Sequence, residues 1–181
     1  MTISGTTISG NSGEGITYYH AYSGSSLTVS GSTISSNSGA GIYITYPQTA
    51  LAFSITNNTI SNNSGDGLHY QNSSIDYVSS PLPSITYNTI TGNSSDGIQL
   101  AGSYSLAVIN YNNLYENSGS YDLRSSVTAQ EVDARYNYWG LTSTAIMGIA
   151  TNPKDMPRIY DYHDNVSYSL VNYAAWLSDA N

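Results

Sequence analysis

A ten-residue phrase recurs along this chain, and its spacing restricts the possible folds more than any other feature. It reads TISGNSGEGI around Ile8, TISSNSGAGI around Ile34, TISNNSGDGL around Ile60 and TITGNSSDGI around Ile90, with a degenerate copy around Leu114. Successive copies are 26, 26, 30 and 24 residues apart. This period is much longer than a coiled-coil heptad and shorter than a propeller blade, and it indicates a solenoid.

Each period contains three short segments in which an apolar residue is flanked by polar ones, as expected for strands with one buried face. No single coil can bury its inner face alone, so neighbouring coils must stack. The sequence therefore predicts an all-β fold, a parallel β-helix with three strands per rung, about five rungs and a C-terminal cap. The predicted inward columns are Ile3, Val29, Ile55, Ile85, Ile109 and Val132; Ile8, Ile34, Ile60, Ile90, Leu114 and Trp139; and Ile16, Ile42, Leu68, Ile98 and Leu123.

Asparagine recurs at two of the corners between predicted strands. Stacked coils would align these residues into columns whose amides hydrogen-bond to the rungs above and below. We therefore expect asparagine ladders, and a sharp turn at the glycine before each third-strand centre. The ladder residues are Asn11, Asn37, Asn63, Asn93 and Asn117, and Asn58, Asn88, Asn112 and Asn137; the glycines are Gly15, Gly41, Gly67 and Gly97.

The two ends of the repeat differ. From about Ala129 the sequence becomes richer in aromatic and charged residues, as expected of a unit that covers the last rung. We assign residues 1–128 to the rungs and 129–181 to the last rung and a capping segment of the same domain, with a short helix around Thr144 to Ala150. The expected plug residues are Tyr136, Trp139, Ile146, Ile149, Ile159, Leu170, Val171 and Trp176.

The N-terminal end begins directly on a first strand at Met1-Thr2-Ile3. An open rung leaves backbone groups unpaired and apolar side chains exposed, which invites pairing with another strand. We therefore expect either further rungs upstream or self-association through this end.

The charge balance excludes some partners. The chain has 12 acidic and 4 basic residues and a net charge of −8, too few cations to neutralise a row of phosphates, so we expect no nucleic-acid partner. No run of about 18 apolar residues is present, so we expect no membrane insertion. Cysteine is absent, and no cofactor is expected.

Oxygen ligands of the kind that Ca²⁺ prefers occur near the C-terminus at Asp155, Asp161, Asp164 and Asn165. Neither an EF-hand loop nor a nonapeptide calcium repeat accompanies them. We interpret them as turn and capping residues and expect no metal site.

The third strand carries the most varied chemistry on its outward side, which we call the third-strand face. Tyrosine rings pack against the C–H patches of sugars, while amide and guanidinium groups hydrogen-bond to sugar hydroxyls. We predict a carbohydrate site there. Alternatively, the tyrosines only cover loops, with Tyr18 and Tyr70 pointing into the core. The predicted ligand-binding residues are Tyr19, Tyr43, His69, Gln99 and Arg124.

Two further alternatives stay open. Glycoside hydrolysis needs two carboxylates about 5 to 10 Å apart, and Asp66 and Asp96 occupy equivalent turns of adjacent rungs, although Asp is also a common structural choice in turns. Ice binding would use flat rows of hydroxyls on the second strand. These rows are Thr7, Thr33, Thr59 and Thr89, and Ser9, Ser35, Ser61 and Thr91.

The repeat and the tail together resemble the right-handed parallel β-helix proteins of the pectate-lyase-like superfamily, in particular large surface and secreted proteins of prokaryotes. The repeat part is the N-T-I-x-x-N-x-x-x-G-I pattern at 58–68, ending in leucine, and at 88–98. The tail part is YNYWG at 136–140, IYD at 159–161 and VNY at 171–173, although Ala175 stands where a proline is usual.

This resemblance implies an extracellular or cell-surface location and frequent contact with polysaccharides. It implies no mechanism, because one fold hosts lyases, hydrolases, epimerases, adhesins and plain stalks. We expect a structural or adhesive protein that binds carbohydrate on the third-strand face, with no catalytic residues. The alternatives are a polysaccharide-active enzyme of lyase, hydrolase or epimerase type, and an ice-binding protein.

Overall fold

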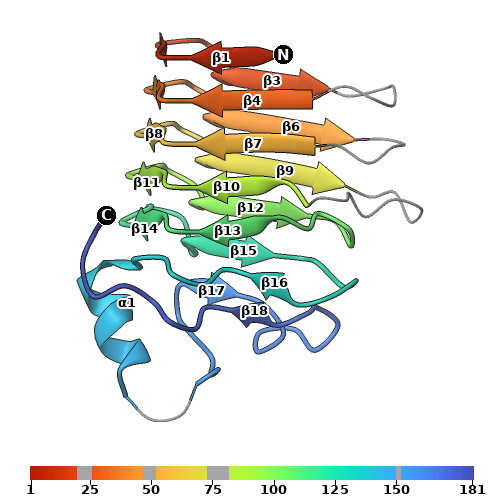
Figure 1. Cartoon of the computed structure of the whole chain (residues 1–181), viewed down its shortest axis with the longest axis vertical. Helices are drawn as coiled ribbons and strands as arrows, with labels where there is room; N and C mark the ends of the chain where they lie inside the picture. The colour runs from red at the N-terminus through yellow and green to blue at the C-terminus, as the bar shows by residue number, and fades with distance from the viewer. Residues whose placement is uncertain (20–25, 47–51, 73–81, 150–151) are drawn as a thin grey trace.

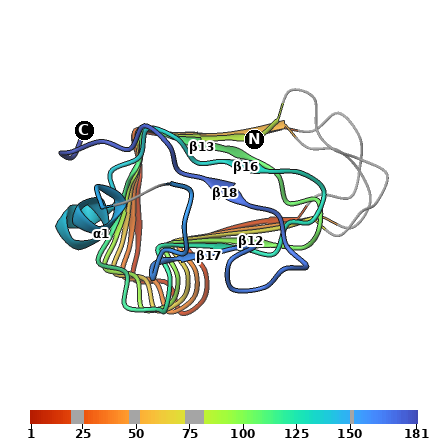
Figure 2. The ribbon, with the colours of Figure 1, turned by 90° about the horizontal axis from the view of Figure 1, so that it is seen from below.

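The computed structural model describes residues 1–19, 26–46, 52–72, 82–149 and 152–181. The chain winds through successive coils of three short strands, stacked along one axis (Figure 1). Seen along this axis, the coils superpose closely (Figure 2). The strands of the coils are β1 (Thr2–Ser4), β2 (Thr7–Ser9), β3 (Ile16–Tyr19), β4 (Ser26–Ser30), β5 (Thr33–Ser35), β6 (Ile42–Tyr46), β7 (Ala52–Thr56), β8 (Thr59–Ser61), β9 (Leu68–Asn72), β10 (Ser84–Thr86), β11 (Thr89–Thr91), β12 (Ile98–Ala101), β13 (Val108–Asn110), β14 (Asn113–Tyr115) and β15 (Leu123–Ser125).

Strands at the same position in adjacent coils pair in parallel and form three walls. The first wall is β1-β4-β7-β10-β13, and the second is β2-β5-β8-β11-β14. The third wall continues past β15 to β17 (Ile159–Tyr160). Ile34 pairs in register with Ile8 on one side and Ile60 on the other. The predicted three-sided parallel β-helix is therefore confirmed.

Inward side chains of the three walls make one continuous core. Ile34, Ile60 and Ile90 have no exposed surface. In the first coil Ile3 and Ile8 are only partly buried, because a single neighbouring coil covers them. A fully buried aliphatic side chain contributes about 1.5–3 kcal/mol, so each coil depends on its neighbours for its stability.

The asparagine ladders form as predicted. The side-chain Nδ2 of Asn63 donates to Oδ1 of Asn93 at 2.9 Å and to the carbonyl of Ile34 at 3.2 Å. The backbone N–H of Asn63 donates to the same Oδ1 at 3.1 Å. One amide therefore links three coils and satisfies polar groups that would otherwise be buried without partners. The column from Asn58 to Asn137 follows the same pattern.

Before each ladder asparagine the backbone passes through the left-handed region, the conformation that Gly, Asn and Ser between the strands predict for the corners. The second-wall strands end in this way at Asn62 and Gly92, with φ of 56° and 68°. Glycine and asparagine suit this conformation. At the preceding corner the same conformation is held by Tyr87, Tyr111 and Tyr136, whose rings stack outside the core with centroids 5.1 Å apart.

Glycine precedes the third strands because the coils approach closely there. A Cβ atom on Gly67 would lie 2.5 Å from Cγ2 of Ile90 and 2.6 Å from the carbonyl oxygen of Gly97. We expect Gly67→Ala to lower the free energy of unfolding by about 2–3 kcal/mol, because these buried neighbours must shift. Urea unfolding followed by circular dichroism measures the loss. Gly13→Ala is the control, since its Cβ would meet nothing within 4 Å, and an equal loss in both variants would contradict the explanation.

The cap consists of β16 (Val132–Asp133), helix α1 (Gly140–Met147), β17 and β18 (Val171–Asn172). β17 pairs with β15, and β16 pairs with β18 through Val132 and Val171 (Figure 1). Trp139, Ile159 and Val171 are buried as predicted. No helix in the described part of the chain is both long and apolar enough to cross a membrane.

Two predictions for the cap were wrong in detail. The helix begins at Gly140, directly after the buried Trp139, and not near Thr144. It ends at Met147, which enters the core, so Ile149 lies beyond it and is 67% exposed. Tyr136 lies outside the core in the tyrosine stack. The buried plug also includes three residues that were not among the expected plug residues: Met147, Met156 and Tyr173.

Candidate functional site

The predicted ligand-binding residues lie largely in one row along the third-strand face. Register pairs Tyr43 with His69, His69 with Gln99 and Gln99 with Arg124. Tyr160 of β17 pairs next to Arg124 and extends the row, although the sequence analysis did not include it. Strand pairing therefore places one side chain of this row on each rung, about 4.8 Å apart.

Tyr19 belongs to a second row on the same face. It pairs with Thr45, which pairs with Gln71, so this row runs beside the first. Tyr19 is 64% exposed. The hydroxyl of Tyr43 donates to Oε1 of Gln71 at 3.4 Å and connects the two rows. Of the predicted tyrosines, Tyr19 therefore has the more open ring.

Tyr43 and His69 stack on one another, with ring centroids 4.8 Å apart and an angle of 30° between the rings. The ring faces that meet in this stack are closed to a ligand, which differs from the open aromatic surface that the sequence suggested. His69 is also held from behind, because its Nδ1 lies 2.9 Å from Oδ2 of Asp66. The stack presents ring edges, a hydroxyl and an imidazole nitrogen.

Arg124 lies between two aromatic rings. Its guanidinium carbon is 5.0 Å from the ring centroid of Tyr160 and 5.9 Å from that of Tyr121. Its nearest carboxylate atom, Oδ2 of Asp96, is 3.9 Å away. The described residues accept no hydrogen bond from Arg124, and its Nε is buried without a partner. Its Nε is shielded from solvent, but the side chain as a whole is 42% exposed, so the terminal guanidinium nitrogens are available to an incoming acceptor.

The two carboxylates behind the row connect adjacent rungs. Oδ1 of Asp66 accepts the backbone N–H of Asp96 at 3.0 Å, and Oδ1 of Asp96 accepts the backbone N–H of Tyr121 at 3.0 Å. Both side chains are buried. One oxygen of each thus has the structural role that is common for aspartate in turns.

The pKa values of these carboxylates move in opposite directions. Burial raises the pKa of Asp66, but hydrogen bonds to its charged form, chiefly from His69, bring it below the ordinary value. Burial also raises the pKa of Asp96, and the Tyr121 N–H offsets this only in part, so it stays above the ordinary value. Unequal acidities of this kind occur in glycosidase carboxylate pairs.

The structure also shows where the residues of three other interpretations lie: the inward tyrosines, the hydroxyl rows and the C-terminal carboxylates. Tyr70 is buried and Tyr18 packs partly buried against the core, so these two tyrosines do point inward. The second wall aligns the hydroxyl residues, as Thr33 with Thr59 shows. Asp161 accepts the backbone N–H groups of Val171 and His163, which is the predicted turn role.

Comparison with known proteins identifies the family to which the chain belongs. The family model described as the right handed beta helix region matches residues 1–136. No curated protein and no solved structure matches the chain. The family match covers all of the stacked coils described above, well over half of the chain. The chain therefore belongs to the right-handed β-helix family.

Proposed function

We propose that this protein is an extracellular or cell-surface β-helix that binds carbohydrate along its third-strand face and has a structural or adhesive role. The observation that carries the proposal is the straight row from Tyr43 to Tyr160, with one polar or aromatic side chain per rung. A linear polymer of sugars that lies along the axis would meet these groups at regular intervals.

The groups in the row suit neutral sugars. The exposed terminal nitrogens of Arg124 make no hydrogen bond with the described residues and can bond to hydroxyl oxygens, and the amide of Gln99 both donates and accepts. His69 is fixed by Asp66, so little side-chain freedom is lost when it meets a ligand. The exposed ring of Tyr19 offers a surface for C–H packing.

A polysaccharide hydrolase is the second candidate, supported by the opposite pKa shifts of Asp66 and Asp96. Against it, one oxygen of each carboxylate already accepts a backbone N–H. Release of reducing ends from a polysaccharide, abolished by Asp96→Asn, would favour the enzyme over the binding protein. Thermal hysteresis of the wild-type protein would instead support ice binding.

We expect the double variant Gln99→Ala/Arg124→Ala to bind oligosaccharides at least tenfold more weakly. Each lost hydrogen bond to a polar ligand is worth about 0.5–1.5 kcal/mol, and more where a charged group takes part. Calorimetric titration with maltotetraose, cellotetraose, mannotetraose and chitotetraose measures the change. Thr33→Ala on the second wall is the control and should bind normally. If no sugar binds the wild type, or the double variant binds as tightly as wild type, the proposed site is wrong.

A further inference from the structure

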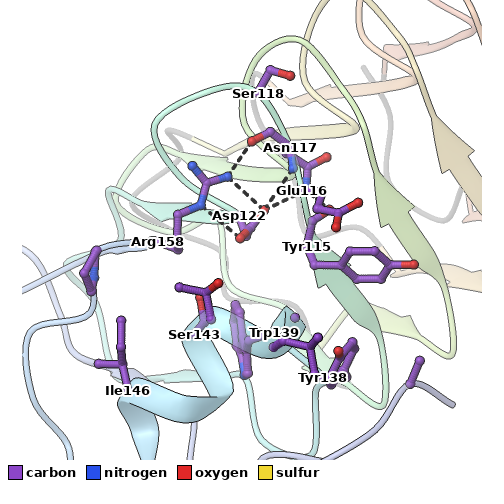
Figure 3. A pocket seen from close by; sticks show the side chains of 15 residues that line it. Tyr115, Glu116, Asn117, Ser118, Asp122, Tyr138, Trp139, Ser143, Ile146 and Arg158 are labelled. Atoms are coloured by element: carbon purple, nitrogen blue, oxygen red, sulfur yellow. Dashed lines mark hydrogen bonds and ion pairs between the residues drawn. The ribbon is translucent and has the colours of Figure 1, made fainter.

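A cleft of about 740 Å³ lies between helix α1 and the corner that follows β14 (Figure 3). β14 belongs to the second wall, so the cleft is separate from the third-strand face. Its volume lies within the range of small-molecule sites, about 300–1,000 Å³. The lining residues used below are Tyr115, Glu116, Tyr138, Trp139, Ser143 and Arg158.

Two residues of the cleft depart from the chain's own repeat. Tyr115 pairs in register with Thr91, so a tyrosine stands where the preceding coil has a small hydroxyl residue. Glu116 follows with a φ of 56°, at the position where the preceding coil has Gly92. Neither residue is needed to build the corner, because the preceding coil forms it with threonine and glycine.

The charged side chains Arg158 and Glu116 of the cleft differ in how many hydrogen bonds they make within the protein. Arg158 donates to both carboxylate oxygens of Asp122 and to the carbonyls of Gly119 and Ser120, so it has little left to offer an anion. The carboxylate of Glu116, in contrast, makes no hydrogen bond or ion pair with the described residues. Figure 3 shows it beside Tyr115, away from the Asp122–Arg158 pair. The cleft therefore presents a free acceptor and no free cation.

Aromatic rings line the cleft beside the Glu116 carboxylate. The rings of Tyr115 and Tyr138 have centroids 5.7 Å apart and meet edge to face at 66°. Trp139 lies beneath, and Ser143 on the helix points its side chain into the cleft (Figure 3). Aromatic rings pack on the C–H face of a sugar, while a carboxylate accepts hydrogen bonds from its hydroxyls. Acidic ligands would be repelled by Glu116.

From these observations we infer that the cleft is a second binding site, for a neutral saccharide. Tyr115 and Tyr138 supply the packing surface, and Glu116 accepts hydrogen bonds from the sugar hydroxyls. The site does not depend on the third-strand face and can be tested separately from it.

The test restores the repeat. The double variant Tyr115→Thr/Glu116→Gly has the same two residues at this corner as the preceding coil, where they are Thr91 and Gly92. It should therefore keep the fold and the unfolding midpoint. The chain has two tryptophans, and Trp176→Phe leaves Trp139 in the cleft as a reporter. In that background we expect maltotetraose, cellotetraose, mannotetraose or chitotetraose to change the Trp139 fluorescence. The double variant should bind this sugar at least tenfold more weakly, and Glu116→Gln should also bind it more weakly.

The controls separate this site from the third-strand face. Gln99→Ala/Arg124→Ala should leave the fluorescence titration unchanged. The inference is overturned if none of the four sugars alters Trp139 fluorescence, or if the restored-repeat variant binds like its parent. It is also overturned if only a cation such as choline binds and its binding depends on Glu116, since this would make the cleft a cation site.

Discussion

Asn93→Ala should lower the free energy of unfolding by about 4 kcal/mol. The substitution removes the acceptor of the backbone N–H of Asn63 and a donor to the carbonyl of Ile60. It also removes the side-chain bonds to Asn63 and Asn117. Each buried polar group left without a partner costs about 1–3 kcal/mol, and the groups that lose bonds lie in the two coils on either side of Asn93. The loss should therefore exceed that of an ordinary single hydrogen bond.

Urea unfolding followed by circular dichroism tests this prediction. The control is Asn62→Gly at the exposed neighbouring position, which copies Gly92 of the next coil in the left-handed conformation. It should stay within about 0.5 kcal/mol of wild type, as most surface substitutions do. A loss below 1 kcal/mol for Asn93→Ala, or an equal loss in the control, would show that the ladder is not a main source of stability.

The coils could be predicted because each rung has the same pattern of inward apolar residues and corner asparagines as the rung before it. Ile34, Ile60 and Ile90 occupy one register of the period, and burial of one in a parallel stack places the others inward as well. The ladder asparagines follow from the same argument. The outward row from Tyr43 to Arg124 was predictable for the same reason, since a register fixes both faces of a strand.

What the repeat does not determine was predicted less well. Helix α1 begins at Gly140, where φ is 76° and an added Cβ would lie 2.9 Å from the Tyr115 Cβ, and the repeat does not specify this local geometry. The Tyr43–His69 stack depends on side-chain rotamers, which the register leaves open. The cleft left a signal in the sequence, because Tyr115 and Glu116 break the columns of their coil. Comparing the columns residue by residue would have found them.

Arg158→Met should destabilise the protein by about 3–5 kcal/mol, because it leaves a buried carboxylate without its cation. The ladder from Asn11 to Asn117 ends on Asp122, which takes the place that the next asparagine has elsewhere in the column. Oδ1 of Asp122 accepts a hydrogen bond from Nδ2 of Asn117 at 2.9 Å. Nε of Arg158 lies 3.1 Å from Oδ2 of Asp122. Asp122 is 2% exposed and the Arg158 guanidinium is the only cation paired with it among the described residues, so Arg158→Met leaves this carboxylate without a cation.

The double variant Asp122→Asn/Arg158→Met separates charge from packing. Asparagine at position 122 can still accept from Asn117 and needs no cation, so the double variant should recover a large part of the loss. Arg135→Met is the surface comparison: this arginine also pairs with a carboxylate, that of Asp133, but in contact with solvent, and its loss should be much smaller. A double variant as unstable as Arg158→Met would assign the loss to the packing of the arginine and its bonds to carbonyls. Recovery would instead mean that the ladder requires a neutralised acceptor at its C-terminal end, which couples the cap to every rung through one column of amides.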